Sequence, residues 1–144
     1  NVNLNAKNSI GRTALIYATY NGHQDCVKLL IDAGADLYFQ NNDGWTALIG
    51  AAYHGHKDCV QLLIDAGANL DIQEIRGKTA ETWANERGHT EIVRMMREAK
   101  KGRELIIFSK QGHLENVEKL LNEEVDINYA DSEGQTALHH AAKG

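Results

Sequence analysis

The pattern of apolar and polar positions repeats along the chain with a period of 33 residues. When residues 13–45 are laid over residues 46–78, 21 of the 33 positions carry the same residue. Within each period, two short segments place apolar residues at helical spacing, and each segment ends at a glycine. Self-similarity at such a period indicates stacked units, each of which buries its apolar face only against its neighbours.

One period predicts a helix, a turn, a second helix and a hairpin. Thr13 is placed to cap the first helix, which ends at Gly22, a residue suited to the left-handed C′ position. The second helix is expected from about Gln24, and residues 36–45 are expected to be extended and to turn at an Asn-Asp-Gly sequence. The residues expected on the buried face of the second helix are Val27, Leu30 and Ile31.

These units resemble ankyrin repeats. The second unit carries the motif as Gly44-Trp45-Thr46-Ala47-Leu48, Ala51-Ala52, Gly55-His56, Val60-Gln61-Leu62-Leu63 and Gly67-Ala68-Asn69. The match recurs from Gly11 through Gly88-His89 and again from Gly112-His113 to Ala142, although alanine stands where the family has a proline after threonine. The resemblance implies an all-α, ankyrin-type helical repeat solenoid with short β-hairpin fingers.

The repeat becomes irregular after residue 78. Residues 79–101 carry more charge and lack a following hairpin, so they resemble a C-terminal capping repeat, and Gly102 is expected to open a helix of an N-cap-like repeat. We therefore expect one ankyrin array over residues 1–101, and an N-cap-like repeat plus a partial repeat over residues 102–144. Three arrangements remain open: a continuous stack lacking one hairpin, a junction of two arrays, or docking of residues 102–144 onto another chain in a domain-swapped homodimer.

The net charge and the cysteines limit which partners and which cellular compartment are expected. The net charge of −5 disfavours a nucleic-acid partner, and no apolar run is long enough to span a membrane. Cys26 and Cys59 lie one period apart, at roughly the ~10 Å spacing of packed helices, whereas a disulfide needs Cα atoms within ~7 Å. We expect both thiols to be reduced, buried and inert, which fits the cytoplasm or the nucleus.

No motif for catalysis or cofactor binding is present, so the chain is not expected to be an enzyme. The pairs His23–Cys26 and His56–Cys59 have ligand-like spacing, but they recur because the unit recurs, and zinc requires four converging ligands. The resemblance implies that these histidines hydrogen-bond the backbone between helices. We therefore expect no catalytic residues, no cofactor and no metal, the last expectation extending to His139-His140.

The function is then expected to lie on a surface. The resemblance implies that hairpin tips and first-helix ends form a concave face that binds another protein. The expected partner-binding residues are Arg12, Tyr20, Asn42, Asp43, Trp45, Tyr53, His54, Arg76, Lys78 and Arg87. Their aromatic members are expected to be exposed anchors, and their cations to select acidic groups. Trp83 is expected to pack inside its repeat instead.

Other interpretations remain beside this one. Trp45 could stiffen the array by packing against Tyr20 rather than contacting a partner. The chain could also be a regulatory or targeting segment of a larger enzyme, such as a kinase. RNA or nucleotide binding by stacking on the aromatic side chains is disfavoured by the negative net charge.

Overall fold

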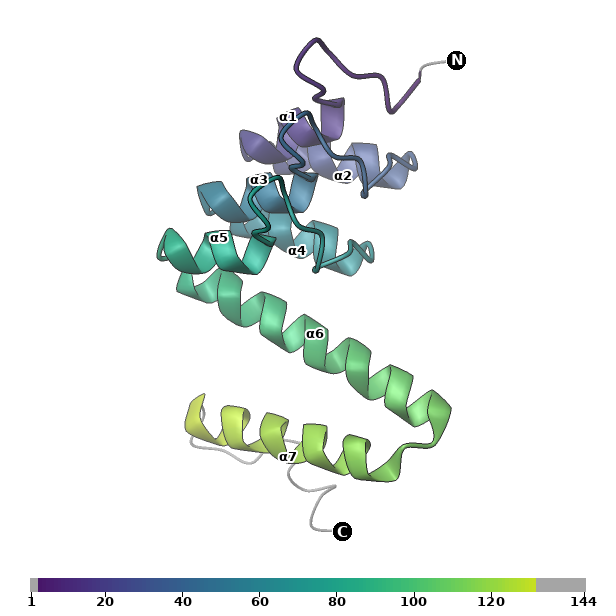
Figure 1. Cartoon of the computed structure of the whole chain (residues 1–144), viewed down its shortest axis with the longest axis vertical. Coiled ribbons are helices and arrows are strands. Elements are labelled where there is room, and N and C mark those ends of the chain that lie inside the picture. Colours follow the sequence, from purple (N-terminus) through teal and green to yellow (C-terminus); the bar gives the residue numbers. More distant parts are fainter. Residues whose placement is uncertain (1–2, 132–144) are drawn as a thin grey trace. The chain divides into compact units, whose positions relative to one another are not determined.

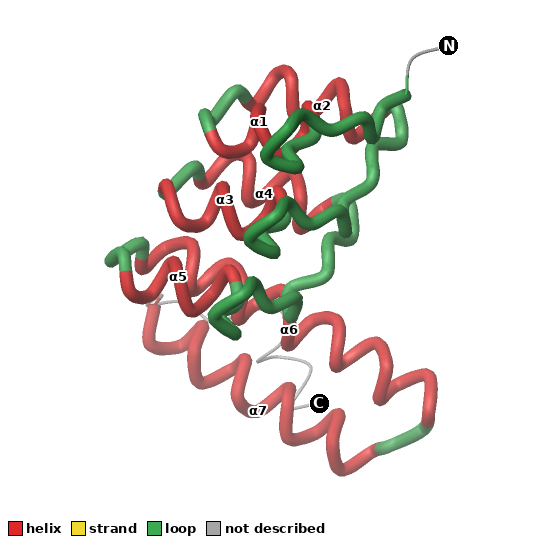
Figure 2. The backbone as a smooth tube through the Cα atoms, turned by 45° about the horizontal axis from the view of Figure 1, so that its top comes forward, coloured by secondary structure: helices red, strands yellow, loops and turns green. Residues whose placement is uncertain are grey.

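A computed structural model of the chain describes residues 3–131, with side chains as far as residue 123, as helices joined by loops. The helices in this range are α1 (Ala14–Tyr20), α2 (Gln24–Asp32), α3 (Ala47–His54), α4 (Lys57–Asp65), α5 (Ala80–Glu86), α6 (Thr90–Gln111) and α7 (Leu114–Asp131). The described residues contain no strand (Figure 2). The expected all-α repeat solenoid is therefore confirmed. The chain divides into two compact units, residues 1–96 and 97–144.

In the first unit the helices form two layers. Helices α1, α3 and α5 pack successively on one another, while α2 and α4 pack together behind them (Figure 1). The predicted cap is confirmed, because the Thr13 hydroxyl accepts a hydrogen bond from the Ile16 amide at 3.3 Å. Thr46 and Thr79 cap α3 and α5 in the same way. Because each first helix begins at the same threonine, the helix ends fall in register along the stack.

The second helices differ in how deeply they are buried. Val27 of α2 and Leu63 of α4 have no exposed surface, whereas Leu30 and Ile31 of α2 are only half-buried. The expectation that Leu30 and Ile31 are buried is therefore only partly met. The reason is that α4 packs against α2, while in the described residues no helix packs on the outer side of α2.

The two cysteines differ in burial for the same reason. Cys59 on α4 is buried, with 1% of its surface exposed, whereas Cys26 on α2 is exposed. The expectation that both thiols are buried is wrong for Cys26, because equivalent positions in a stack are covered only where a neighbouring repeat lies against them. Both cysteines are free thiols.

The loops that precede the first helices form three finger-like turns, which lie one beside the next (Figure 2). In each finger one side-chain oxygen accepts two backbone N–H groups, two and four residues further on, at 2.8–3.1 Å. The accepting residues, one period apart, are Asn8, Asn41 and Glu74. One backbone bond also closes each finger, such as Asn41 N–H to the Trp45 carbonyl at 2.9 Å. The predicted turn is present, but the fingers are loops rather than β-strands.

The second unit, described to residue 131, contains the later part of α6 and helix α7. The helix expected to open at Gly102 does not, because α6 continues without a break from Thr90 to Gln111. One interior glycine costs a helix only about 1 kcal/mol, too little to interrupt it without a competing turn. Helix α6 instead ends just before Gly112, whose φ is 74°. Lys101 and Glu123 form an ion pair at 3.6 Å.

Several expectations stay untested by the fold. The boundary expected after residue 101 falls inside α6, and whether residues 102–144 stack in cis or in trans stays a prediction. His139-His140 lies outside the described residues. Among residues 3–131, no helix has the combined length and apolar character needed to cross a bilayer.

Candidate partner-binding surface

Five side chains from three successive repeats form a row at the ends of the first helices. The guanidinium carbon of Arg12 lies 4.3 Å from the ring centroid of Tyr20, which in turn lies 4.1 Å from that of His54. The row continues from His54 to Tyr53 at 4.9 Å, and the guanidinium of Arg87 lies 4.5 Å from the Tyr53 ring. The caps that align the first helices thus align cationic and aromatic groups as well.

A cluster of three large rings adjoins this row. Tyr53 lies 5.0 Å from both Trp45 and Trp83, and the two indoles lie 5.7 Å apart. Because these rings cover one another, Tyr20, Tyr53 and Trp45 are half-buried rather than exposed as expected. The ring contacts of Trp45 within the described residues are with Tyr53 and Trp83, so packing of Trp45 on Tyr20 does not occur.

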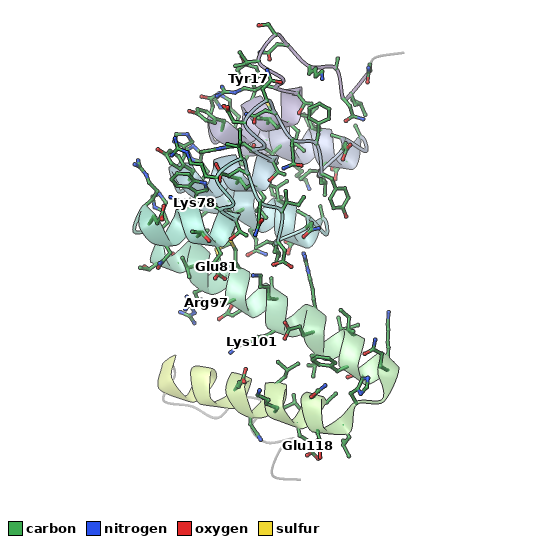
Figure 3. The ribbon with its side chains drawn as sticks, in the orientation of Figure 1. Tyr17, Lys78, Glu81, Arg97, Lys101 and Glu118 are labelled. Atoms are coloured by element: carbon green, nitrogen blue, oxygen red, sulfur yellow. The ribbon has the colours of Figure 1, made fainter. Side chains whose placement is uncertain are left out.

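The row and the cluster line a cavity of about 370 Å³. Its wall on the side of the fingers consists of Arg12, Asn41, Asp43, Glu74, Ile75 and Arg76. Its aromatic wall consists of Tyr20, Trp45, Tyr53 and Trp83. In Figure 3, side chains crowd this part of the first unit between the labelled Tyr17 and Lys78. The cavity therefore draws on three repeats, and none of them alone could form it.

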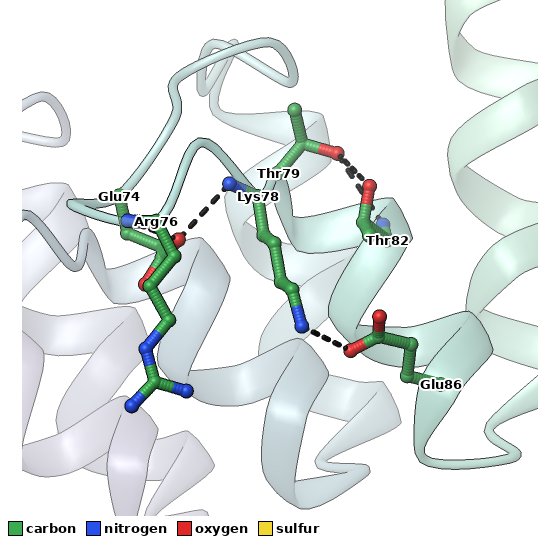
Figure 4. A network of polar contacts seen from close by, with 6 residues as sticks. All are labelled: Glu74, Arg76, Lys78, Thr79, Thr82 and Glu86. Atoms are coloured by element: carbon green, nitrogen blue, oxygen red, sulfur yellow. Dashed lines mark hydrogen bonds and ion pairs between the residues drawn. The ribbon is translucent and has the colours of Figure 1, made fainter.

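The cations on this surface are not equivalent. The Lys78 ammonium pairs with Glu86 at 2.8 Å and lies 4.3 Å from the Trp83 ring. By contrast, the guanidinium of Arg76 extends away from its finger (Figure 4), and no ion pair forms with it among the described side chains. Within the described part of the chain, Arg12 and Arg87 also have no carboxylate partner. Charge is thus available at the arginines and largely neutralised at the lysine.

Three buried polar atoms on or beside this surface have no hydrogen-bond partner within the described residues. They are Nε of Arg12, Nε2 of His54 and Nε1 of Trp83. Burial of His54 lowers the pKa of its imidazole below 6.5, and the positive charges of His56, Arg87, Arg12 and His89 lower it further. A guanidinium or indole nitrogen can only donate, so Arg12 and Trp83 each present to the cavity a donor that no acceptor of the described residues satisfies.

The structure brings most of the predicted residues together. Arg12, Tyr20, Asp43, Trp45, Tyr53 and Arg76 line the cavity itself. His54, Lys78 and Arg87 contact its aromatic side chains. Asn42 is outside the lining, and its amide instead approaches the Ser9 carbonyl at 3.5 Å. These positions follow from the family resemblance, which locates hairpin tips and first-helix ends but does not supply their contacts.

Sequence reasoning missed four lining residues or undervalued them. Trp83 was set aside as a packing residue, although it forms part of the aromatic wall. The repeat period gave no signal for its inclusion, because the equivalent residue one period earlier is Gly50, which has no side chain. The other lining residues not proposed as partner-binding are Asn41, Glu74 and Ile75.

Two histidines of successive repeats contact the backbone of the repeat before them. The Nε2 atoms of His56 and His89 lie 3.0 Å from the carbonyl oxygens of Tyr20 and Tyr53, each in the preceding repeat. The expected backbone role is therefore confirmed for His56, but it is wrong for His23, which is exposed and has no side-chain hydrogen bond among the described residues, because no described helix precedes α1. In the part of the chain that the structure describes, no three His, Cys, Asp or Glu side chains gather as a metal site would require.

The stacked helix pairs and the shared cavity define a helical-repeat solenoid with a composite surface. Three family models match this chain, described as ankyrin repeats (3 copies) over residues 33–104, ankyrin repeat over 10–42 and ankyrin repeats (many copies) over 105–144. The chain belongs to the ankyrin repeat family. Comparison with curated proteins found no match. Ankyrin repeats are protein–protein interaction modules and are generally non-catalytic.

Proposed function

We propose that this chain binds a partner protein on the surface formed by the row and the aromatic cluster, and that it does so as a non-catalytic module. The observation that carries the proposal is the shared cavity, because it places on one face half-buried rings and guanidinium groups that have no ion pair within the part of the chain that the structure describes. Tyrosine, tryptophan and arginine are the residues most enriched among interface hot spots.

The rings serve as anchors in this proposal. Tyr20, Trp45 and Tyr53 each combine a large apolar body with a polar group, so they gain from desolvation and still form hydrogen bonds. Trp45 packs on Tyr53, and both tyrosines pack on His54, so the rings are held in place before a partner arrives, which reduces the entropy lost on binding. Arg12, Arg76 and Arg87 select acidic groups on the partner.

The test is loss of binding in a Trp45→Ala, Tyr53→Ala double variant. Partners are first captured on the wild-type chain and identified by mass spectrometry, and their affinity is then measured by calorimetry. We expect the double variant to lose about 2 kcal/mol or more of binding free energy. The matched control is Tyr38→Ala, which removes an exposed aromatic side chain outside the cavity. Unchanged affinity in the double variant would show that the partner binds elsewhere.

Location and assembly complete the proposal. The free thiols and the absence of a disulfide between Cys26 and Cys59 support a reducing compartment, the cytoplasm or the nucleus. A homodimer formed by exchange of residues 102–144 remains a second proposal. Light scattering tests it directly, because a monomer mass at every concentration would exclude the exchange.

A further inference from the structure

Two of the buried nitrogens without partners lie at opposite ends of the cavity. Arg12 precedes α1, Trp83 belongs to α5, and α3 packs between these two helices. Both residues line the cavity, and Nε of Arg12 and Nε1 of Trp83 have no acceptor among the described residues. A buried donor without an acceptor is unfavourable, so a ligand that brings an oxygen to each end would be favoured.

On the basis of the proposed function, we infer that the cavity takes an extended acidic segment of the partner protein, with defined polarity. A carboxylate of the segment binds Arg12, and an uncharged acceptor, such as a backbone carbonyl, binds the indole N–H of Trp83. Apolar side chains between them rest on Trp45 and Tyr53. The two ends lie about two repeat spacings of ~10 Å apart, a distance that about six extended residues span.

The Arg12 end requires a charged acceptor. Its guanidinium already stacks on the Tyr20 ring at 4.3 Å, which holds the planar group in place and leaves its edge available. No carboxylate of the described chain pairs with it. A stacked guanidinium fork matches the two oxygens of a carboxylate, and such charge-assisted pairs are the stronger kind of hydrogen bond.

The Trp83 end favours an uncharged acceptor. Lys78 lies over the Trp83 ring and is already paired with Glu86 (Figure 4). The cation in contact with this ring is therefore already paired, and a carboxylate bound at the indole would have to compete with Glu86 for it. A carbonyl oxygen satisfies the indole N–H without that competition, because tryptophan only donates.

The middle of the cavity distinguishes a peptide from a nucleic acid. Asp43 is exposed at its rim, and Glu74 is buried in its wall with Oε1 accepting the amides of Arg76 and Lys78. A strand with a phosphate at every residue would bring negative charge close to both carboxylates. A peptide can place backbone N–H donors there and keep its carboxylate at Arg12.

A cationic ligand is also disfavoured. Three aromatic faces that could receive a cation are already occupied by cations of the chain at 4.3–4.5 Å. These pairs are Arg12 on Tyr20, Arg87 on Tyr53 and Lys78 on Trp83. A ligand ammonium would therefore meet like charge instead of a free ring face.

The test uses the full chain, immobilised and exposed to a displayed library of random peptides of about 12 residues, longer than the six residues needed. Synthetic copies of the selected peptides are then titrated by fluorescence anisotropy. We expect Asp or Glu to be enriched at one end of the selected sequences, followed by apolar residues. Arg12→Gln should weaken these peptides about tenfold or more, and Arg12→Lys should weaken them less.

Two further variants probe the other end and the specificity of the charge effect. Trp83→Phe removes the indole N–H but keeps an aromatic ring, and we expect it to weaken binding several-fold. Lys28→Gln removes an exposed cation from α2 and should leave binding unchanged. Circular dichroism melting of each variant verifies that its fold is retained. If Arg12→Gln unfolds, the affinity of the conservative Arg12→Lys variant is used to test the Arg12 contact.

The outcomes separate this inference from the function on which it rests. Peptides that depend on Trp45 and Tyr53 but lack acidic residues, or that carry acids at both ends, would overturn the inference and leave the interaction surface intact. Selected peptides that are indifferent to a Trp45→Ala, Tyr53→Ala change would overturn the proposed function itself. Tighter binding of a single-stranded RNA 12-mer in the same titration would overturn the choice of a peptide.

Discussion

The Nε2 atom of His56 lies 3.0 Å from the carbonyl oxygen of Tyr20. Since Tyr20 ends α1 and His56 precedes α4, this bond joins the last turn of one first helix to the next repeat. His89 makes the equivalent bond to Tyr53. These two histidines therefore hold the backbone of two aromatic residues that line the cavity, and they connect the stability of the stack to the geometry of its surface.

We expect His56→Ala to destabilise the chain by about 1–2 kcal/mol, because the Tyr20 carbonyl loses its inter-repeat donor. Urea denaturation followed by circular dichroism measures the change. His23→Ala is the matched control, since His23 occupies the same position in the preceding repeat but is exposed and has no side-chain partner in the described residues. Equal losses in both variants would show that the bond itself contributes nothing.

Two glycines should respond to alanine in opposite directions. Gly50 is helical, and a Cβ there would lie in ordinary contact with Tyr20 at 3.7 Å, so Gly50→Ala should stabilise α3 by up to about 1 kcal/mol. Gly55 has φ 74°, and a Cβ there would lie 2.6 Å from the His89 ring, so Gly55→Ala should destabilise the chain. Thermal melting of both variants tests this. A gain at Gly55 would contradict the packing described.

Stability should decrease as the pH falls, in part because of His54. Its pKa is lowered in the folded chain, first by burial and then by His56, Arg87, Arg12 and His89. Between that lowered pKa and the ordinary value of 6.5, the unfolded chain binds more protons, so acidification favours unfolding. His54→Gln should therefore show a smaller decrease in urea midpoint between pH about 7.5 and about 5.5. An unchanged pH dependence would contradict this assignment.

The charge contribution to that shift can be measured separately. Arg87→Gln removes a nearby positive charge and should raise the pKa of His54, as followed by NMR titration of its imidazole signals. Lys28→Gln is the control, because its charge is not among those that lower the pKa. If Arg87→Gln leaves the titration unmoved, Arg87 does not lie close to His54 in solution.

The two thiols should differ in reactivity. Cys26 is exposed, whereas Cys59 is buried, and its pKa is raised by burial and by the Asp58 carboxylate. Because the thiolate is the reactive form, a thiol reagent should modify Cys26 rapidly in the native chain, and it should modify both cysteines in urea. Mass spectrometry of the product identifies the modified residue. Rapid native modification of Cys59 would show that α2 does not cover α4.

The helical layers were predictable because their signals are local. Thr13 caps a helix through its own hydroxyl, and Gly22 ends it by adopting a backbone that other residues avoid. Gly102 had no such local competitor, and α6 continued through it. At Gly102 the resemblance to the start of a family repeat predicted a new helix, but the preceding turn has no residue that ends a helix. The missing stop signal was the better guide to the structure.

The surface was predictable only in part. The resemblance to ankyrin repeats located Tyr20, Tyr53 and Trp45, because it placed the hairpin tips and the first-helix ends on one face. It did not include Trp83, because the equivalent residues of the two preceding repeats, Tyr17 and Gly50, are not among those that line the cavity. It also grouped Lys78 with the arginines as a free cation. The ion pair of Lys78 with Glu86 was not predictable, because it requires the finger to fold back toward α5.

By itself, the sequence determined the family, the period and the helix ends, because hydroxyl caps, glycine turns and apolar spacing act within a few residues along the chain. Only the tertiary structure decided which equivalent positions are covered, which cations are free and which rings meet. Those properties depend on what the neighbouring repeat places opposite each side chain, as Cys26 and Cys59 show. Burial and pairing are relations between repeats, and a pattern that recurs in every repeat cannot specify them.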